Sequence, residues 1–153
     1  MNTTERTKMF FNCLADNWDK NCIRDLKKIE VIIMLADIKR GSHVVDIGCG
    51  TGILFEEILA RQPDELLGVD FSDRMIAVAE NKFHDIRLRL TATDVFALNE
   101  NGFDAAIIYS AYPHFLDKQK LAGKVADMLV PGGRIIIAHS ESSLCTPPSD
   151  CVA

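Results

Sequence analysis

The apolar residues of this chain recur with two different periods. In residues 23–36 they stand three or four positions apart, at Ile23, Leu26, Ile29, Ile33 and Ala36, which predicts an amphipathic helix. Short continuous apolar runs predict five strands, at residues 44–47, 66–69, 86–90, 104–109 and 134–138. Helical patterns follow three of these strands, at residues 53–60, from the expected N-cap Ser72 to Phe83, and at 118–129.

The alternation of strands and helices predicts an α/β fold. We expect a doubly wound, mostly parallel five-stranded sheet with helices on both faces, because the strands are apolar throughout. The 153 residues suit a single domain. Within it we expect an N-terminal helical cap at residues 1–40, a core at 41–140, and an irregular tail at 141–153, which is rich in Ser and Pro.

The charge balance narrows the choice of partners. The formal net charge is −5, and an acidic chain repels phosphate backbones, so no nucleic-acid partner is expected. No apolar run reaches the ~18–20 residues of a membrane span, and residues 1–13 lack the apolar core of a signal peptide. These features predict no membrane association and a cytoplasmic location. The five cysteines show no CxxC pairing, which favours free thiols and indicates no metal site.

Glycines alternate where the first strand meets the helix that follows it. Gly48, Gly50 and Gly52 stand in "DIGCGTGILF", and such a turn is a candidate nucleotide site at the carboxyl end of a parallel sheet. The dinucleotide fingerprint G-x-G-x-x-G fails, because Ile53 or Phe55 stands where the third glycine is required. The P-loop also fails, since no Gly-Lys-Ser/Thr follows. An NAD(P)-dependent oxidoreductase is therefore the least favoured function.

The segment "VVDIGCGTG", residues 44–52, resembles the first motif of the class I S-adenosylmethionine-dependent methyltransferases, "VLDIGCGTG". The resemblance continues in order through "LLGVDFSDRMIAVA", "TATDVFAL", "FDAAIIYSAYPHFLD" and "LVPGGRIIIAHS". It implies a small-molecule methyltransferase domain over residues 1–140 with a Rossmann-like core, strand order 3-2-1-4-5, and S-adenosylmethionine as the cofactor with S-adenosylhomocysteine as its product. The cofactor-binding residues that the resemblance implies are Asp46, Gly48, Cys49, Gly50, Gly52, Asp70, Phe71, Met75, Asp94, Val95 and Tyr109.

The same resemblance gives roles to several of these residues. Asp70 would accept hydrogen bonds from both ribose hydroxyls, and Asp94 would accept one from the adenine amino group. Phe71 and Met75 would flank the adenine. Asp46 would orient the glycine turn and the amino end of the ligand. The absence of a Cβ on the turn glycines would let the backbone approach a bulky methionyl-adenosine closely.

The residues themselves leave alternatives open. Met75 fits a core position as well as a ligand wall, and Asp94 could simply cap a helix. The segment "FFNCLADNWD", residues 10–19, resembles the N-terminal helix that closes over the cofactor in small-molecule methyltransferases, but a merely packed aromatic face is an equal interpretation.

Candidates for catalysis follow the fourth and fifth strands. Methyl transfer from a sulfonium is an in-line displacement, so the protein mainly has to align the acceptor and exclude water. A general base is needed only if the acceptor must lose a proton. Tyr112, His114 and His139 are the candidate bases, because all three follow strands that end at the carboxyl edge of the sheet. The sequence leaves the identity of the acceptor open.

The sequence departs from the family pattern after the fifth strand. Most members continue with another helix and two further strands, whereas only fourteen residues follow His139 here. Two functions are therefore weighed: methyl transfer to a small-molecule acceptor, or a cofactor-binding module with little or no catalysis. Residues 134–138 have the composition of a strand covered on both faces but would lie at an open edge, which predicts a homodimer through the fifth strand.

Overall fold

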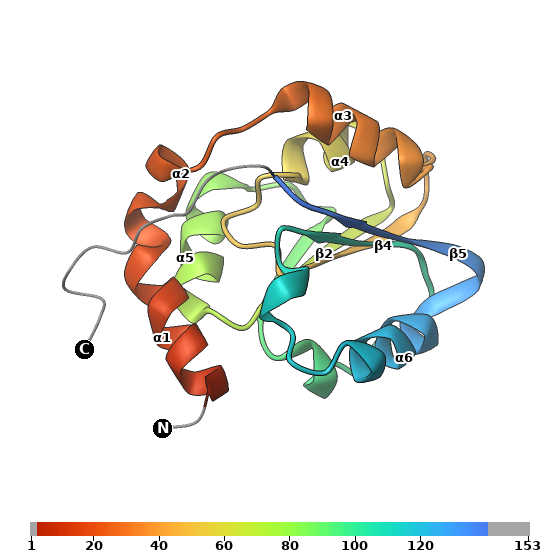
Figure 1. Cartoon of the computed structure of the whole chain (residues 1–153). Helices are drawn as coiled ribbons and strands as arrows, with labels where there is room; N and C mark the ends of the chain where they lie inside the picture. Colours follow the sequence, from red (N-terminus) through yellow and green to blue (C-terminus); the bar gives the residue numbers. More distant parts are fainter. Residues whose placement is uncertain (1–2, 141–153) are drawn as a thin grey trace.

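The computed structural model describes residues 3–140, so the predicted tail at 141–153 lies outside the described residues. Helices and strands alternate along the chain (Figure 1). The elements are α1 (Thr3–Leu14), η1 (Ala15–Asn17), α2 (Trp18–Asn21), α3 (Leu26–Leu35), β1 (His43–Ile47), α4 (Phe55–Ala60), β2 (Glu65–Asp70), α5 (Asp73–Lys82), β3 (Leu88–Ala92), η2 (Val95–Ala97), β4 (Phe103–Tyr109), η3 (Tyr112–His114), α6 (Lys118–Met128) and β5 (Leu129–Ala138).

The five strands form one parallel sheet. Their order is β3-β2-β1-β4-β5, which confirms the predicted fold class and strand order. The chain moves outward from β1 to β3 and then returns to the other side of β1 with β4. In such a sheet the crevice for a ligand lies beyond the carboxyl ends of the two strands where the direction changes, here β1 and β4.

Each face of the sheet carries an apolar cluster. Val44 and Ile107 face α3, α4 and α5 and pack with Phe55, whereas Val45 and Ile108 belong to the second cluster, on the face of α6 and η2. Adjacent residues of a strand point to opposite faces, so a strand that is buried on both faces is apolar throughout. Figure 1 shows α3 and α4 on one side of the sheet and α6 on the other, with α1 and α2 beside α5.

Several boundaries differ from the predicted ones. The helix expected from residue 23 begins at Leu26, because the Asp25 side chain accepts a hydrogen bond from the Lys28 backbone N–H (3.1 Å) and caps it. Ile23 precedes this helix and is largely exposed. The strand expected at residues 86–90 occupies Leu88–Ala92 instead, and Ile86 is fully exposed before it. Each error falls at the end of an element, where the apolar pattern carries little information.

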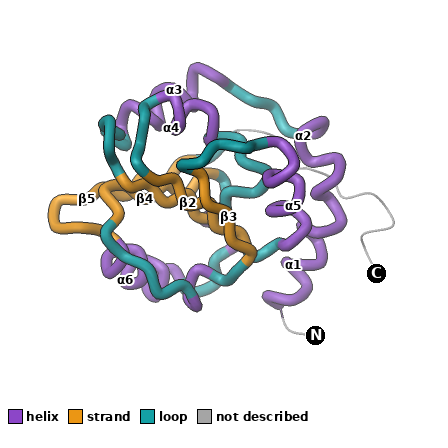
Figure 2. The backbone as a smooth tube through the Cα atoms, turned by 180° about the vertical axis from the view of Figure 1, so that it is seen from behind, coloured by secondary structure: helices purple, strands orange, loops and turns teal. Residues whose placement is uncertain are grey.

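β5 begins five residues earlier than predicted. Leu129 pairs with Phe103, and a register shift follows before Arg134 pairs with Ala105. The Pro131-Gly132-Gly133 stretch falls in this irregular part, which Figure 2 shows bulging out at the end of the sheet. On the side of the second cluster, Ile135 and Ile137 remain 41% and 44% exposed. This face of β5 is thus partly open among the described residues, contrary to the expectation of full cover on both faces.

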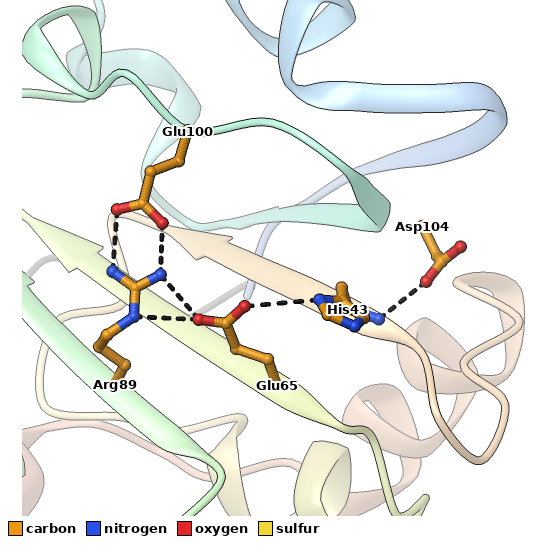
Figure 3. Close-up of polar contacts among 5 residues, drawn as sticks. All are labelled: His43, Glu65, Arg89, Glu100 and Asp104. Atoms are coloured by element: carbon orange, nitrogen blue, oxygen red, sulfur yellow. Dashed lines mark hydrogen bonds and ion pairs between the residues drawn. The ribbon is translucent and has the colours of Figure 1, made fainter.

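A polar network ties the strands together near their amino ends (Figure 3). The Arg89 guanidinium on β3 contacts the carboxylates of Glu65 (2.7 Å) and Glu100. Glu65 also faces His43, and the His43 backbone N–H donates to Asp104 (2.8 Å). The network joins β3, β2, β1 and β4 at the edge opposite the predicted site, and it leaves the carboxyl edge free for a ligand.

Two further expectations concern the cysteines and the membrane. Cys13, near the end of α1, is disulfide-bonded, so the prediction of free thiols is wrong for this residue. Cys49 is a free and buried thiol. Within residues 3–140, the structure contains no helix with the length and apolar character of a membrane span.

Candidate active site

A cavity of about 740 Å³ opens at the carboxyl edge of the sheet. The residues after β1, β2 and β3 line one part of it, and the residues after β4 and β5 line the other, beneath the N-terminal helical segment. Eleven of the predicted site residues line this cavity: Gly48, Cys49, Gly50, Asp70, Phe71, Met75, Asp94, Val95, Tyr109, His114 and His139. Asp46, Gly52 and Tyr112 do not line it.

The glycine turn is held against the end of β2 by backbone hydrogen bonds. The N–H groups of Gly48 and Cys49 donate to the Val69 carbonyl (2.7 and 3.1 Å). Gly48 and Gly50 have φ of 72° and 54°, a left-handed conformation that glycine adopts without the penalty of a Cβ. A Cβ on Gly48 would lie 2.4 Å from the Cβ of Ala111, so Gly48 allows the turn to pack against the residues after β4. A Cβ on Gly50 would meet no backbone and only Trp18 Nε1, at 3.9 Å, among the described residues within 4 Å.

Gly52 serves packing rather than the cavity. Its φ is 87°, and a Cβ there would lie 2.4 Å from the ring of Phe55, with the ring of Phe83 at 2.9 Å. Phe55 is fully buried at the start of α4. The third glycine of the motif therefore lets α4 pack closely against the sheet, and its place in the motif alone does not distinguish this role from ligand contact.

Asp70 links the end of β2 to the glycine turn. One carboxylate oxygen accepts a hydrogen bond from the Gly50 backbone N–H (2.9 Å), and the other accepts one from the Ser72 N–H (2.8 Å). Burial raises the pKa of Asp70, and these two backbone donors oppose the rise. Each carboxylate oxygen can accept more than one hydrogen bond, so Asp70 retains acceptor capacity toward the cavity that it lines.

Asp46 lies beneath the turn and does not reach the cavity. Its side chain is 1% exposed, and neither carboxylate oxygen has a hydrogen-bond partner among the described residues. Burial, together with the charge of Asp70, raises the pKa of Asp46 to about 8. The carboxyl group is therefore mostly protonated at neutral pH. Its expected role in orienting the turn and the ligand stays a prediction.

The part of the cavity beside β2 and β3 combines apolar walls with a carboxylate. Met75 is 1% exposed yet lines the cavity, so it is both a core residue and a wall. Val95 is also buried and lines the cavity, and Phe71 is half-buried. Asp94 caps η2, because its side chain accepts from the Phe96 N–H (3.0 Å), and it also lines the cavity. Met75 is therefore a core residue and Asp94 a helix cap, and the contact of either with a ligand stays a prediction.

Aromatic side chains of the N-terminal segment form the roof of the cavity. The Phe11 ring contacts Phe71 and His114 edge to face, at centroid distances of 6.0 and 4.9 Å, and it also contacts Trp18 at 5.7 Å. Phe11 thus touches residues from both parts of the cavity. The sequence marked residues 10–19 only by their resemblance to a covering helix, and nothing in their spacing singled out Phe11.

Polar contacts hold this roof in place. Thr51 of the glycine turn donates to Asp19 (2.5 Å), whose second oxygen contacts the Lys82 ammonium (2.6 Å). Ser72 donates to the Asn12 side-chain oxygen (2.6 Å), which connects α1 to the N-cap of α5. The roof is therefore attached to the glycine turn and to α5, on the side of the cavity beside β1 and β2.

His114 and His139 are the two histidines in the cavity lining. Both are accessible to solvent, one after β4 and the other after β5. Partial burial, together with the charge of His139, lowers the pKa of His114 below its usual value of 6.5. A neutral imidazole therefore predominates at pH 7, as a proton acceptor requires.

The two tyrosines near this region are less suited than the histidines to act as a base in the cavity. Tyr112 packs its ring against the second apolar cluster, with the Lys118 ammonium 5.1 Å from the ring centroid. The structure does not bring Tyr112 to the cavity, because η3 turns its ring toward that cluster. Tyr109 lines the cavity, and burial raises the pKa of its phenol. Tyr109 therefore remains protonated at neutral pH and is unsuited to act as a base.

Ser110 is a cavity residue that the sequence did not reveal. Its φ is 56°, a conformation uncommon for a residue other than glycine. Its backbone N–H donates to the Ala138 carbonyl (2.8 Å), and its hydroxyl accepts from the Ser140 N–H (2.9 Å). These bonds join the ends of β4 and β5. No cluster of three metal-ligating side chains occurs in the part of the chain that the structure describes.

The parallel sheet, its strand order and a glycine turn bonded to Asp70 define a Rossmann-like methyltransferase domain. The chain matches the family model described as "Methyltransferase domain" over residues 44–133, and it belongs to this family. A ubiquinone biosynthesis O-methyltransferase of Coxiella burnetii is 32% identical over 117 residues, which cover 74% of this chain and 48% of that protein. A demethylmenaquinone methyltransferase of Thermus thermophilus is 31% identical over 118 residues, covering 74% and 54%.

A solved structure supports the same assignment. The S-adenosylmethionine-dependent methyltransferase from Mesorhizobium loti superposes with a TM-score of 0.66 and 25% identity, covering 75% of this chain and 53% of that one. The chain thus spans about half the length of these relatives.

The family and the fold imply S-adenosylmethionine as the cofactor, and the residues present fit it. Within 4 Å, a Cβ on Gly50 would meet only Trp18 Nε1, at 3.9 Å, so the turn leaves room for a ligand against its backbone. Asp70 offers a buried acceptor suited to vicinal hydroxyls. Phe71 and Met75 offer apolar surface of the kind that a purine covers.

Proposed function

We propose that this protein transfers the methyl group of S-adenosylmethionine to a small-molecule acceptor. The observation that carries the proposal is the single cavity that joins the Asp70-bonded glycine turn to an end lined by His114 and His139. The cofactor supplies a methyl group activated by a sulfonium. The names of two relatives, a ubiquinone biosynthesis O-methyltransferase and a demethylmenaquinone methyltransferase, support an acceptor that is a small molecule.

Some residues of the chain would bind the cofactor, and others would take part in proton transfer. Asp70 would accept hydrogen bonds from the ribose hydroxyls, each charge-assisted bond contributing about 1.5–3 kcal/mol. Phe71 and Met75 would flank the adenine, and Asp94 would accept from its amino group. Phe11, above the cavity, would exclude water from the reacting atoms.

Incubation with S-adenosylmethionine and a panel of phenols, amines and thiols tests the proposal. Mass spectrometry should detect an acceptor heavier by one methylene unit, together with S-adenosylhomocysteine. Tight binding of both cofactor forms with no methylated product from any acceptor would favour the alternative, a cofactor-binding module with little or no catalysis. A lack of cofactor binding would contradict both.

We further propose a homodimer through β5. The outer edge of β5 has no strand partner within residues 3–140, and Ile135 and Ile137 are exposed beside it. A two-fold axis would pair two identical edges, which satisfies their free backbone groups. Ile137→Glu should convert a dimer to a monomer in sedimentation at micromolar concentration, whereas Ile86→Glu, at a fully exposed residue, should not. A monomeric unmodified protein would contradict the proposal.

The remaining sequence-based expectations stay predictions. These are the division into a cap at residues 1–40 and a core at 41–140, the cytoplasmic location, and the absence of nucleic-acid and membrane partners. Limited proteolysis tests the division, and cell fractionation tests the location.

A further inference from the structure

The end of the cavity beyond β4 and β5 is distinct from the end that fits the cofactor's adenosine. Asp70, Phe71 and Asp94 follow β2 and β3, on one side of the glycine turn. On the other side, His114 follows β4 and His139 follows β5. An acceptor must approach the methyl group from the side away from the adenosine. The chemistry of this second end therefore determines which acceptor fits.

Four charged side chains line the described part of the cavity, and three of them lie toward the adenosine end. The charged residues in the described lining are Asp70, Asp94, Asp117 and Lys120. Lys120 lies 4.5 Å from the ring centroid of Phe96 in η2, and η2 is the element that Asp94 caps. Asp117 lies three residues after His114 and caps α6, where its carboxylate accepts from the Lys120 backbone N–H (2.8 Å).

At the acceptor end Asp117 is the one charged residue of the described lining, because Lys120 lies toward η2, and the Asp117 carboxylate is engaged in the cap of α6. This end is also lined by Phe11, Trp18, Cys22, Ile23, Ser110, His114, His139 and Ser140. The charge of Asp25 helps to raise the pKa of Tyr109. Asp25 itself does not line the cavity, and its side chain caps α3. A charged acceptor would lose its hydration here, and the carboxylate present already accepts a hydrogen bond in the helix cap, so burial of that acceptor would be costly. This end therefore suits an uncharged molecule.

Aromatic side chains provide most of the apolar surface at this end. Phe11 lies between Trp18 and His114, with ring planes at 64° and 87° to its own. Rings inclined in this way offer both faces and edges to a planar ligand. Aromatic pairs contribute about 0.5–1.5 kcal/mol beyond the free energy that comes from burying their surface. A flat aromatic acceptor makes better use of this surface than an aliphatic one.

His114 limits the functional group that can react. Its lowered pKa leaves a neutral imidazole at pH 7. A phenolic hydroxyl, with a pKa of about 10, can give its proton to this base as its oxygen attacks. An amine whose own pKa is about 10 would enter as a cation, and an aliphatic alcohol is too weak an acid.

We propose that the acceptor is an uncharged phenol-type compound, whose ring lies against Phe11 and whose hydroxyl faces His114, the general base. This inference rests on the proposed methyl transfer. The imidazole takes the phenolic proton while the phenolic oxygen bonds to the methyl carbon. The bond between that carbon and the sulfonium sulfur breaks, and its electron pair stays on sulfur. The products are a methyl ether and a neutral thioether, and the imidazolium returns its proton to water.

Binding measurements with the full chain test the acceptor class without turnover. Catechol is titrated calorimetrically into the protein saturated with S-adenosylhomocysteine, in parallel with 3,4-dihydroxybenzoate, benzylamine and cyclohexane-1,2-diol. Catechol should bind at least tenfold more tightly than each of the other three. Relative to catechol, 3,4-dihydroxybenzoate adds an anionic group, benzylamine carries a cation, and cyclohexane-1,2-diol lacks the aromatic ring. Equal or tighter binding of the carboxylate or of the amine would overturn the proposal.

Variants of the histidines test the base. His114→Gln should bind S-adenosylhomocysteine and catechol within about threefold of the unmodified protein, and methyl transfer to catechol should fall at least about 100-fold. The matched control His84→Gln, at an exposed residue outside the cavity, should change neither. Transfer within threefold of normal in His114→Gln would overturn the assignment of the base.

The pH dependence gives an independent readout. Catalytic efficiency, kcat/KM, should rise with pH through the pKa of His114, because only the neutral imidazole accepts a proton, and then level off. His139→Gln should raise the pKa of His114 in a proton NMR titration of its ring, since it removes the neighbouring charge that lowers this pKa. An unchanged pKa would contradict the electrostatic interaction between the two histidines and, with it, the proposed lowering of the His114 pKa.

The outcomes separate this inference from the proposed function. Binding of S-adenosylhomocysteine with no binding of catechol would overturn the acceptor class and leave cofactor-dependent methyl transfer standing. Failure of S-adenosylhomocysteine to bind would overturn both.

Discussion

The Thr51 hydroxyl donates a hydrogen bond of 2.5 Å to the carboxylate of Asp19. Thr51 belongs to the glycine turn and is 1% exposed, whereas Asp19 belongs to α2 in the N-terminal segment. This contact joins the roof of the cavity to the turn beneath it. Because one partner is charged and the other is buried, the bond falls in the stronger range, about 1.5–3 kcal/mol.

Thr51→Val should loosen the roof without disturbing the shape of the turn. Valine has nearly the same volume as threonine but cannot donate to Asp19. We expect the free energy of unfolding to fall by about 1–3 kcal/mol and limited proteolysis within residues 1–22 to become faster. Thr3→Val, at an exposed residue of α1, serves as the control. Unchanged proteolysis in Thr51→Val would show that other contacts alone hold the segment.

The glycines of the turn should respond differently to alanine. In Gly52→Ala the new Cβ would meet the ring of the buried Phe55, so we expect a loss of at least about 2 kcal/mol of stability through overpacking and strain. In Gly50→Ala the Cβ meets only Trp18 Nε1, at 3.9 Å, and occupies space left for the ligand, so we expect strain of about 1–2 kcal/mol but at least tenfold weaker binding of S-adenosylhomocysteine. Thermal melts and calorimetry distinguish the two. This division would be contradicted if both variants lost the same binding affinity and had the same stability.

Asp46 should make the stability of the ligand-free protein depend on pH. Its pKa is about 8 in the folded chain against 3.8 when exposed, so the folded state holds a proton that the unfolded state has lost between these values. The stability from this proton is complete below pH 3.8 and is lost as pH rises through about 8.

Asp46→Asn should remove this dependence, because the amide stays neutral. Each pKa unit corresponds to about 1.4 kcal/mol, so urea unfolding should show the variant more stable than the unmodified protein at pH 8 by at least about 2 kcal/mol. At pH 5 the difference should be smaller. Parallel stability curves at the two pH values would mean that Asp46 is not the group that titrates.

The sequence predicted the sheet well because its central strands β1, β2 and β4 are short apolar runs covered on both faces. It predicted β5 less well, since the irregular pairing around Pro131 depends on β4 and has no local signal. The positions of Asp70 and Gly50 in the cavity lining follow from the resemblance to the family motifs. Tyr112 could not be placed, because the direction of its ring is decided by the apolar cluster under η3. Phe11 was not singled out within residues 10–19 for a similar reason, as its partners Phe71 and His114 are remote in the chain.

Calorimetric titration of S-adenosylhomocysteine into the full chain, with Asp70→Asn as the variant and Asp64→Asn as the surface control, tests the central claim most directly. We predict one binding site, no heat with NAD, and an affinity at least tenfold lower in Asp70→Asn, equal to more than about 1.4 kcal/mol. Asp64→Asn, at an exposed residue outside the cavity, should bind normally. Binding of NAD in place of S-adenosylhomocysteine, or an affinity unaffected by Asp70→Asn, would contradict the account.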